Sequence, residues 1–213
     1  ITKLPEEKVT FQHDPFVYLG GIEWMIVRND QQFVLAAKGG SNHEPHNHND
    51  VGNFIVHHQD ESLIVDLGAP VYDRGFFSGK RYTYLAARSM GHSVPLVNGY
   101  EQHAGGGDTK AQTVVTRRGG ETTMEINMTA AYPKEAGLKS LIRSIIFKNE
   151  GEIVVRDQIQ SEETPKSFET AFWTYGSVSI DENTILVQGE TSAIQIIYPS
   201  ERVELEIREY STK

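Results

Sequence analysis

Short apolar stretches separated by turn-forming residues run along the whole chain. The stretches are rich in Val, Ile, Thr, Phe and Tyr, which suit the pleated, half-buried surface of a sheet. Between them, 19 Gly and 8 Pro leave few windows long enough for a helix. The strands that this pattern predicts are 16–19, 24–28, 33–38, 52–58, 62–67, 93–98, 111–117, 122–128, 138–147, 152–160, 167–174, 185–188, 193–198 and 202–207. Their spacing of roughly 8 to 12 residues predicts an all-β fold, a large two-sheet antiparallel β-sandwich of the supersandwich type with few or no helices.

Two polar tetrapeptides predict tight hairpins within this sandwich. Lys-Asn-Glu-Gly at 148–151 and Gln-Asp-Glu-Ser at 59–62 each lie between two apolar runs. The stretch 79–89 has apolar residues at helical spacing, but it is short, and a loop is an equally good prediction. No repeat or linker divides the sequence, so residues 1–213 are predicted to form one domain.

The amino-acid composition excludes several classes of protein and of functional site. The 213 residues include no cysteine, which excludes a disulfide framework, a thiolate zinc site and a cysteine nucleophile. Twenty basic against 29 acidic side chains give a net charge of −9, and without a basic stripe the chain is not expected to bind nucleic acid. No apolar run approaches the roughly 18 residues of a membrane span, so membrane insertion is not expected. The sequence begins at Ile1 without a leader-like segment, so we expect a removed leader or a domain of a longer protein.

The histidines are unevenly placed. Five of the eight fall within residues 43–58, and the densest segment is Asn-His-Glu-Pro-His-Asn-His-Asn-Asp at 42–50. In an extended segment alternate residues share a face, so His46, His48 and Asp50 would point the same way. Two imidazoles and a carboxylate on one face suit a metal site or proton transfer. A polar, Asn-rich loop whose side chains cap the backbone is an alternative of equal weight.

A metal needs a further protein ligand, and Asp66 and His92 are the candidates. Asp66 ends an apolar strand, where a buried carboxylate needs a partner or a metal. His92 lies at the entry to another apolar strand. Two imidazoles and one carboxylate suit Zn²⁺ with an open fourth position, with Mn²⁺ or Fe²⁺ as weaker alternatives.

The predicted hairpin sets a condition on this site. If 59–62 makes a simple turn, Asp66 pairs near Ile55, and His48 then lies roughly 20 Å away along the strand. The site closes only if 46–50 folds back or the strand pairing differs.

One metal-binding family offers a partial match. Gly40, five residues, then His46 and His48 resemble the first half of the metal motif of the cupin family. The glutamate ligand that should follow is absent from 49–53, and the second cupin motif is missing around His92. A cupin-like metalloenzyme is therefore the weaker alternative.

Three segments agree in order and spacing with the motifs of another family. They are His-Asn-His-Asn-Asp-Val-Gly-Asn-Phe at 46–54, Leu-Ile-Val-Asp-Leu-Gly at 63–68 followed by Tyr72, and Gly-His-Ser-Val-Pro-Leu-Val-Asn-Gly at 91–99 followed by Gln102. A weaker match continues through 141–143, 154–157 and 172–174. Over most of its length the chain resembles the C-terminal β-sandwich domain of the heparinase II/III-like polysaccharide lyases. Ser93 stands where that family often has Asn, a departure that leaves the metal ligands intact.

The resemblance implies a zinc ion bound by His48, Asp66 and His92, with His46 facing the substrate cleft. Family members cleave acidic polysaccharides by β-elimination. A base removes the proton alpha to the uronate carboxyl, the charge that develops on the carboxylate is neutralised, and an acid protonates the leaving glycosidic oxygen. His46 is the expected proton-transfer or carboxylate-neutralising group.

Four further side chains are candidates for substrate contact. Tyr72 is the second catalytic candidate and Tyr84 a weaker one, and the alternative for each is a half-buried sandwich residue with a hydrogen-bonded hydroxyl. Arg81 and Arg88 lie between two of the proposed ligands and suit carboxylate or sulfate groups, so they are the candidate substrate-binding residues. An ordinary solvated segment is the alternative for the arginines.

The resemblance also implies partners. The family places much of its active site on an N-terminal α/α toroid, so we expect an acidic polysaccharide or oligosaccharide substrate and a toroid in the same parent chain. The isolated domain is then expected to fold and bind metal with little or no lyase activity. The family's substrates favour a periplasmic or secreted location. A non-catalytic carbohydrate-binding module, with a purely structural histidine cluster, is the alternative from a different functional class.

Overall fold

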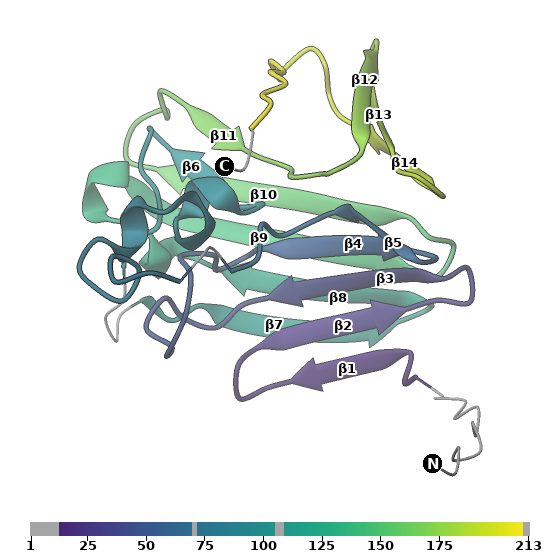
Figure 1. Ribbon diagram of the computed structural model, residues 1–213, viewed down its shortest axis with the longest axis horizontal. Coiled ribbons are helices and arrows are strands. Elements are labelled where there is room, and N and C mark those ends of the chain that lie inside the picture. Colours follow the sequence, from purple (N-terminus) through teal and green to yellow (C-terminus); the bar gives the residue numbers. More distant parts are fainter. Residues whose placement is uncertain (1–12, 70–71, 105–108, 211–213) are drawn as a thin grey trace, which may run out of the picture.

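The protein is built from antiparallel sheets, and the two largest form a sandwich (Figure 1). The computed structural model describes residues 13–69, 72–104 and 109–210. The five-stranded sheet has the order β1-β2-β3-β4-β5, with β1 at Phe16–Leu19, β2 at Trp24–Arg28, β3 at Phe33–Lys38, β4 at Phe54–His58 and β5 at Glu61–Ile64. The four-stranded sheet has the order β10-β9-β8-β7, with β7 at Gln112–Arg118, β8 at Glu121–Asn127, β9 at Leu138–Lys148 and β10 at Ile153–Ser161. The predicted all-β sandwich is confirmed.

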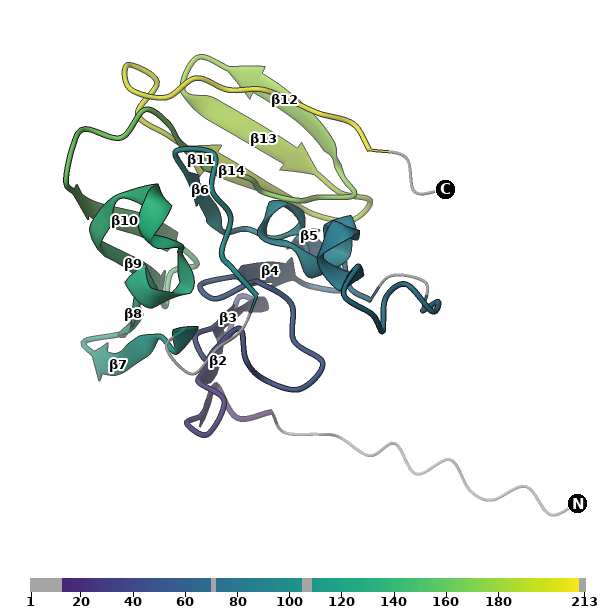
Figure 2. The same ribbon diagram turned by 90° about the vertical axis from the view of Figure 1, so that its left-hand side faces the viewer.

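The core lies between these two sheets, which face one another (Figure 2). Met25 and Leu35 enter it from the five-stranded sheet, and Ile126 and Ile145 enter it from the four-stranded sheet, all fully buried. Along β8 and β9 buried and less buried residues alternate, as expected where only one face of a sheet is covered. The period of two in the sequence therefore sets which side chains fill the core.

Two small sheets complete the fold. In the first, β6 at Pro95–Val97 pairs with β11 at Phe168–Thr170. In the second, β12 at Ser177–Asp181, β13 at Thr184–Gln188 and β14 at Ala193–Ile197 lie side by side at one end of the sandwich (Figure 1). The short β6 matters for the site because it begins three residues after His92.

The strand predictions succeed up to residue 198, where each overlaps an observed strand, and both predicted hairpins form. The prediction for 202–207 is wrong, because no strand is assigned over 203–210. The apolar and charged residues alternate there, but a strand also needs a neighbouring edge to pair with. The pattern of apolar residues does not predict β12, because Ser-Val-Ser-Ile-Asp has only two apolar residues.

The stretch 79–89 forms neither a helix nor an irregular loop. It contains successive 3₁₀ turns, η1 at Arg81–Thr83, η2 at Leu85–Ala87 and η3 at Ser89–Gly91, and extended residues separate them. Two more such turns, η5 at Thr129–Ala131 and η6 at Lys134–Ala136, lie between β8 and β9. Among the residues that the structure describes, no helix is long and apolar enough to cross a membrane.

Candidate metal centre

Three side chains of the kind that bind metals meet beside the end of β5. His48 lies in the loop between β3 and β4, Asp66 follows β5 by two residues, and His92 directly follows η3. Their potential ligand atoms all lie within 4.8 Å of one another. Nδ1 of His92 is 2.8 Å from Oδ2 of Asp66, and the ring centroids of His48 and His92 are 5.2 Å apart. The structure thus brings together the three residues that the resemblance selected as ligands.

The loop that carries His48 folds back, which meets the condition set by the hairpin. The hairpin between β4 and β5 forms as expected. The backbone N–H of Asn49 donates to the carbonyl of Ala87 at 3.0 Å, and the Ser89 hydroxyl donates to the carbonyl of Asn49 at 2.8 Å. These bonds hold the loop against η2 and η3, and therefore close to His92.

The expected extended face of His46, His48 and Asp50 is not present. The segment 42–50 is a series of turns, and His46 has a φ of 58°, in the left-handed region. Asp50 instead forms an ion pair of 2.5 Å with Lys38. The alternative of an Asn-rich loop is therefore correct for the backbone, and of these three side chains only His48 belongs to the cluster.

Hydrogen-bond donors surround the carboxylate of Asp66. The Asn53 side chain donates to Oδ2 at 2.7 Å, and the Gly68 backbone N–H donates to Oδ1 at 2.7 Å. Burial opposes ionisation, but the hydrogen bond and charge of His92, followed by the Gly68 bond, hold the pKa of the Asp66 carboxyl below its ordinary value. Asp66 is therefore ionised at neutral pH, which is the form that binds a cation.

The two imidazoles of the cluster are suited to the same task. Burial, followed by the charge of His92, lowers the pKa of His48, so its ring is neutral at pH 7. His92 is fully buried, and its Nε2 has no hydrogen-bond partner among the described residues. Because a buried nitrogen without a partner costs free energy, a ligand for it is favoured. Two imidazoles and a carboxylate fit a divalent cation such as Zn²⁺.

The two predicted catalytic residues lie outside this cluster. His46 is exposed on the turn that leads into His48. Tyr72 is 60% exposed, and its ring centroid lies 5.0 Å from that of Phe76 and 5.5 Å from that of Phe77. Tyr72 is therefore not the half-buried sandwich residue of the alternative, and the catalytic roles of His46 and Tyr72 stay predictions.

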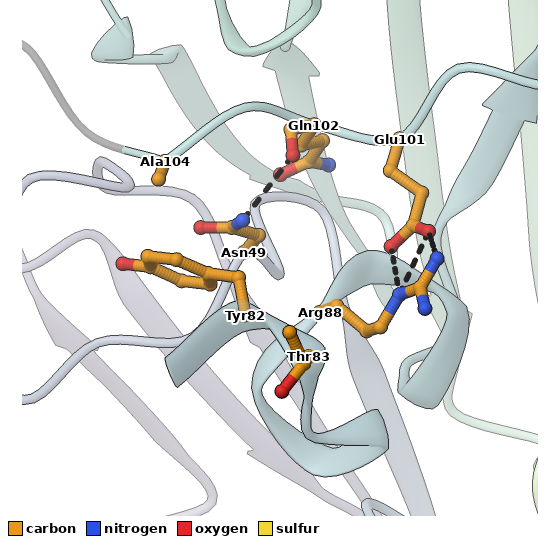
Figure 3. Close-up of a pocket in the computed structure, with 7 residues that line it drawn as sticks. All are labelled: Asn49, Tyr82, Thr83, Arg88, Glu101, Gln102 and Ala104. Atoms are coloured by element: carbon orange, nitrogen blue, oxygen red, sulfur yellow. Dashed lines mark hydrogen bonds and ion pairs between the residues drawn. The ribbon is translucent and has the colours of Figure 1, made fainter. Parts of the chain in front are cut away.

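Arg88, a predicted substrate-binding residue, already has an acidic partner. Its Nε donates to both carboxylate oxygens of Glu101, at 2.9 and 3.1 Å, and Nη2 adds a further bond (Figure 3). The pair lines a pocket next to Tyr82, Asn49 and Gln102. The Arg88 side chain stays 39% exposed. A substrate carboxylate would therefore have to compete with Glu101 for this arginine.

Arg81 and Tyr84 also make internal contacts. Arg81 donates to the backbone carbonyl of Asn47, and its guanidinium carbon lies 4.8 Å from the centre of the Phe76 ring. The Tyr84 hydroxyl donates to Asp73 at 2.6 Å, and this hydrogen bond raises the pKa of the phenol. Arg81 thus supports the loop before His48, and Tyr84 remains protonated at neutral pH.

Several buried polar side chains that are not among the predicted site residues also hold the site. The Gln102 side chain pairs with both backbone groups of Val51, donating to the carbonyl at 2.7 Å and accepting from the N–H at 3.0 Å. Asn53 reaches Asp66, and Arg143 lies fully buried behind the loop. Arg143 occupies an inward position of the alternating strand β9, a mismatch that can be seen in the sequence. Gln102 lies in a loop, and its signal in the sequence is its place just after the family segment 91–99.

The fold and the cluster together define a β-sandwich domain with a His/Asp/His site between its loops. The family model described as Heparinase II/III-like, C-terminal matches residues 13–212, and the chain belongs to this polysaccharide-lyase family. The resemblance seen in the sequence is confirmed, and the cupin alternative is wrong. A search of curated proteins found no match.

Solved structures share the fold. The heparan sulfate lyase HepC from Pedobacter heparinus aligns with a TM-score of 0.65 and 17% identity, over 83% of this chain and 27% of that one. A heparinase III aligns with a TM-score of 0.64 and 18% identity, over 78% of this chain and 26% of that one. The chain thus spans about a quarter of the length of these lyases, and at such identities the likeness establishes the fold alone.

Proposed function

We propose that this chain is the metal-binding β-sandwich domain of a lyase that cleaves uronate-containing acidic poly- or oligosaccharides by β-elimination. The observation that carries the proposal is the cluster of His48, Asp66 and His92 in a member of this family. Zn²⁺ is the expected ion, because two imidazoles and one carboxylate are typical of its sites. When bound, it supplies a fixed positive charge beside the loop that carries His46.

His46 is the proposed proton-transfer group on this domain. It is exposed and lies two residues before His48, on a loop that buried hydrogen bonds hold in place. An imidazole can both accept and donate a proton, which suits removal of the proton alpha to the uronate carboxyl or neutralisation of that carboxyl. Tyr72, an exposed phenol, is the proposed partner that protonates the leaving oxygen.

Arg88 and Arg81 are the proposed contacts for substrate carboxylate or sulfate groups, with the substrate replacing Glu101 as the partner of Arg88. An N-terminal α/α toroid in the same parent chain would supply the other catalytic groups. The isolated domain would then be inactive, and the lyase would act in the periplasm or outside the cell.

A lyase assay on the full-length parent tests this proposal. Cleavage of acidic polysaccharides should produce the ultraviolet absorbance of unsaturated uronate, and His46→Ala should remove it. His43→Ala is the matched control, because His43 is an exposed histidine of the same loop and should leave turnover unchanged. Normal turnover by His46→Ala would remove His46 from the mechanism. Binding of the polysaccharide by the parent without any cleavage would instead favour a carbohydrate-binding module.

A further inference from the structure

A guanidinium group is fully buried behind the candidate metal centre. Arg143 lies on β9, and Asp157 stands directly opposite it on β10. Nε and Nη2 of Arg143 donate to the two oxygens of Asp157, at 2.8 and 2.7 Å, in a bidentate ion pair. The charge of Arg143 is therefore balanced within the four-stranded sheet, which leaves Nη1 directed at other groups.

Nη1 of Arg143 joins the two segments that carry the site. It donates to the backbone carbonyl of Gly52 at 3.0 Å and to that of Ser93 at 2.5 Å. Gly52 lies in the loop that carries His48, and Ser93 directly follows His92. One nitrogen thus hydrogen-bonds to both backbone segments that carry the histidines of the cluster.

Asn53 extends this connection to the third ligand. Its side-chain oxygen accepts the Ser93 N–H at 2.9 Å, and its side-chain nitrogen donates to Asp66 at 2.7 Å. The backbone of Ser93 is therefore held on both sides, by Asn53 at its N–H and by Arg143 at its carbonyl. A shift of the guanidinium would change how His92 faces Asp66.

Stability alone does not explain a charge in this position. A buried ion pair contributes little compared with apolar residues of the same volume, because both charges lose their hydration. The hydrogen bonds from Arg143 to two backbone carbonyls, by contrast, fix the two segments that carry the candidate metal ligands His48 and His92. We propose that Arg143 is the positioning residue of the His48, Asp66 and His92 site, an inference that rests on the metal binding in the proposed function.

Cobalt titration of the 213-residue chain tests this proposal, because the visible absorption of Co²⁺ reports the geometry of its ligands. Arg143→Lys keeps the positive charge but loses the planar guanidinium, whose several N–H groups make these hydrogen bonds. We expect it to weaken Co²⁺ binding about 10- to 100-fold, the usual effect of changing a group that orients metal ligands, and to alter the absorption spectrum. Asp157→Glu keeps both charges and displaces the guanidinium, so it should weaken binding even if Arg143→Lys does not fold.

The control is Ile145→Ala, which removes a fully buried side chain from the same face of β9. It should lower the melting temperature while leaving the Co²⁺ affinity within about threefold and the spectrum unchanged. Equal loss of affinity in Ile145→Ala, or wild-type affinity and spectrum in Arg143→Lys and Asp157→Glu, would overturn the positioning role.

A metal-free measurement separates this inference from the proposed function. The ring nitrogen shifts of His92, measured by NMR without added metal, report its hydrogen bond to Asp66. They should change in Arg143→Lys or Asp157→Glu and stay as in wild type in Ile145→Ala. If wild type binds no Co²⁺, the proposed metal centre fails, while unchanged shifts in the Arg143 and Asp157 variants would refute the positioning role itself.

Discussion

At the scale of single residues, Gly52 holds a conformation that suits no side chain. Its φ is 89°, and an added Cβ would lie 2.6 Å from the sulfur of Met128. We expect Gly52→Ala to lower the free energy of unfolding by about 1–3 kcal/mol, since it combines backbone strain with overpacking. Urea denaturation measures the change.

Gly79 provides the matched control for that substitution. It has an ordinary φ, and open space surrounds the position of its missing Cβ. Gly79→Ala should therefore change the free energy of unfolding by less than about 0.5 kcal/mol. If the two substitutions lower the free energy of unfolding equally, the backbone conformation and close packing at Gly52 do not cause the loss.

The site residues differ in how far the sequence could predict them. His48, Asp66 and His92 were predicted because metal ligands come from few residue types and the family motif orders them. Asn53 and Arg143 act through backbone groups of distant segments, so their roles appear only once the chain is folded.

At the scale of elements, strand patterns predicted the sheets well because alternation reports which face is buried. They failed at 202–207, where the pattern is right but no sheet edge pairs with the segment. They also could not predict the turns of 42–50, because Asn, His and Asp suit loops and extended segments alike. Local pattern thus predicts elements, while their pairing depends on the rest of the molecule.

The carboxylate of Glu61 connects the five-stranded sheet to the small sheet of β12, β13 and β14. Glu61, at the start of β5, accepts the backbone N–H groups of Glu190, Thr191 and Ser192, at 2.8, 3.1 and 3.3 Å, in the turn between β13 and β14. Glu61→Gln should lower the hydrogen-exchange protection of the turn several-fold, because the amide binds these donors more weakly than a carboxylate. Glu152→Gln, which removes an exposed pairing with Lys148 elsewhere, should leave the turn unchanged.

The same contact predicts a pH dependence. The backbone bonds, led by that of Glu190, lower the pKa of Glu61 in the folded protein. A lowered pKa means that the stabilisation is present above the unfolded value, about 4.3, and is lost as the pH falls through the folded value. The difference in protection between wild type and Glu61→Gln should therefore be full at pH 7 and shrink below about pH 4. A difference that persists in strong acid would contradict this role.

At the scale of the whole molecule, one core between two sheets suggests that the chain folds by itself. We expect the isolated 213 residues to unfold in a single cooperative transition in calorimetry, at a temperature that rises when Zn²⁺ is added. The same sample should release no unsaturated uronate from acidic polysaccharides. Turnover by the isolated chain would contradict the proposed division of the active site between two domains.

The proposed function depends on the binding of a divalent metal by His48, Asp66 and His92, and the metal content of the purified chain measures that binding. After loading with Zn²⁺ and removal of the excess, elemental analysis should find about one zinc per chain in wild type and in His57→Ala, a histidine outside the cluster. His48→Ala should retain almost none. A wild-type chain without zinc under every loading condition, or a His48→Ala variant with a full complement of zinc, would show that these three residues are not a metal site.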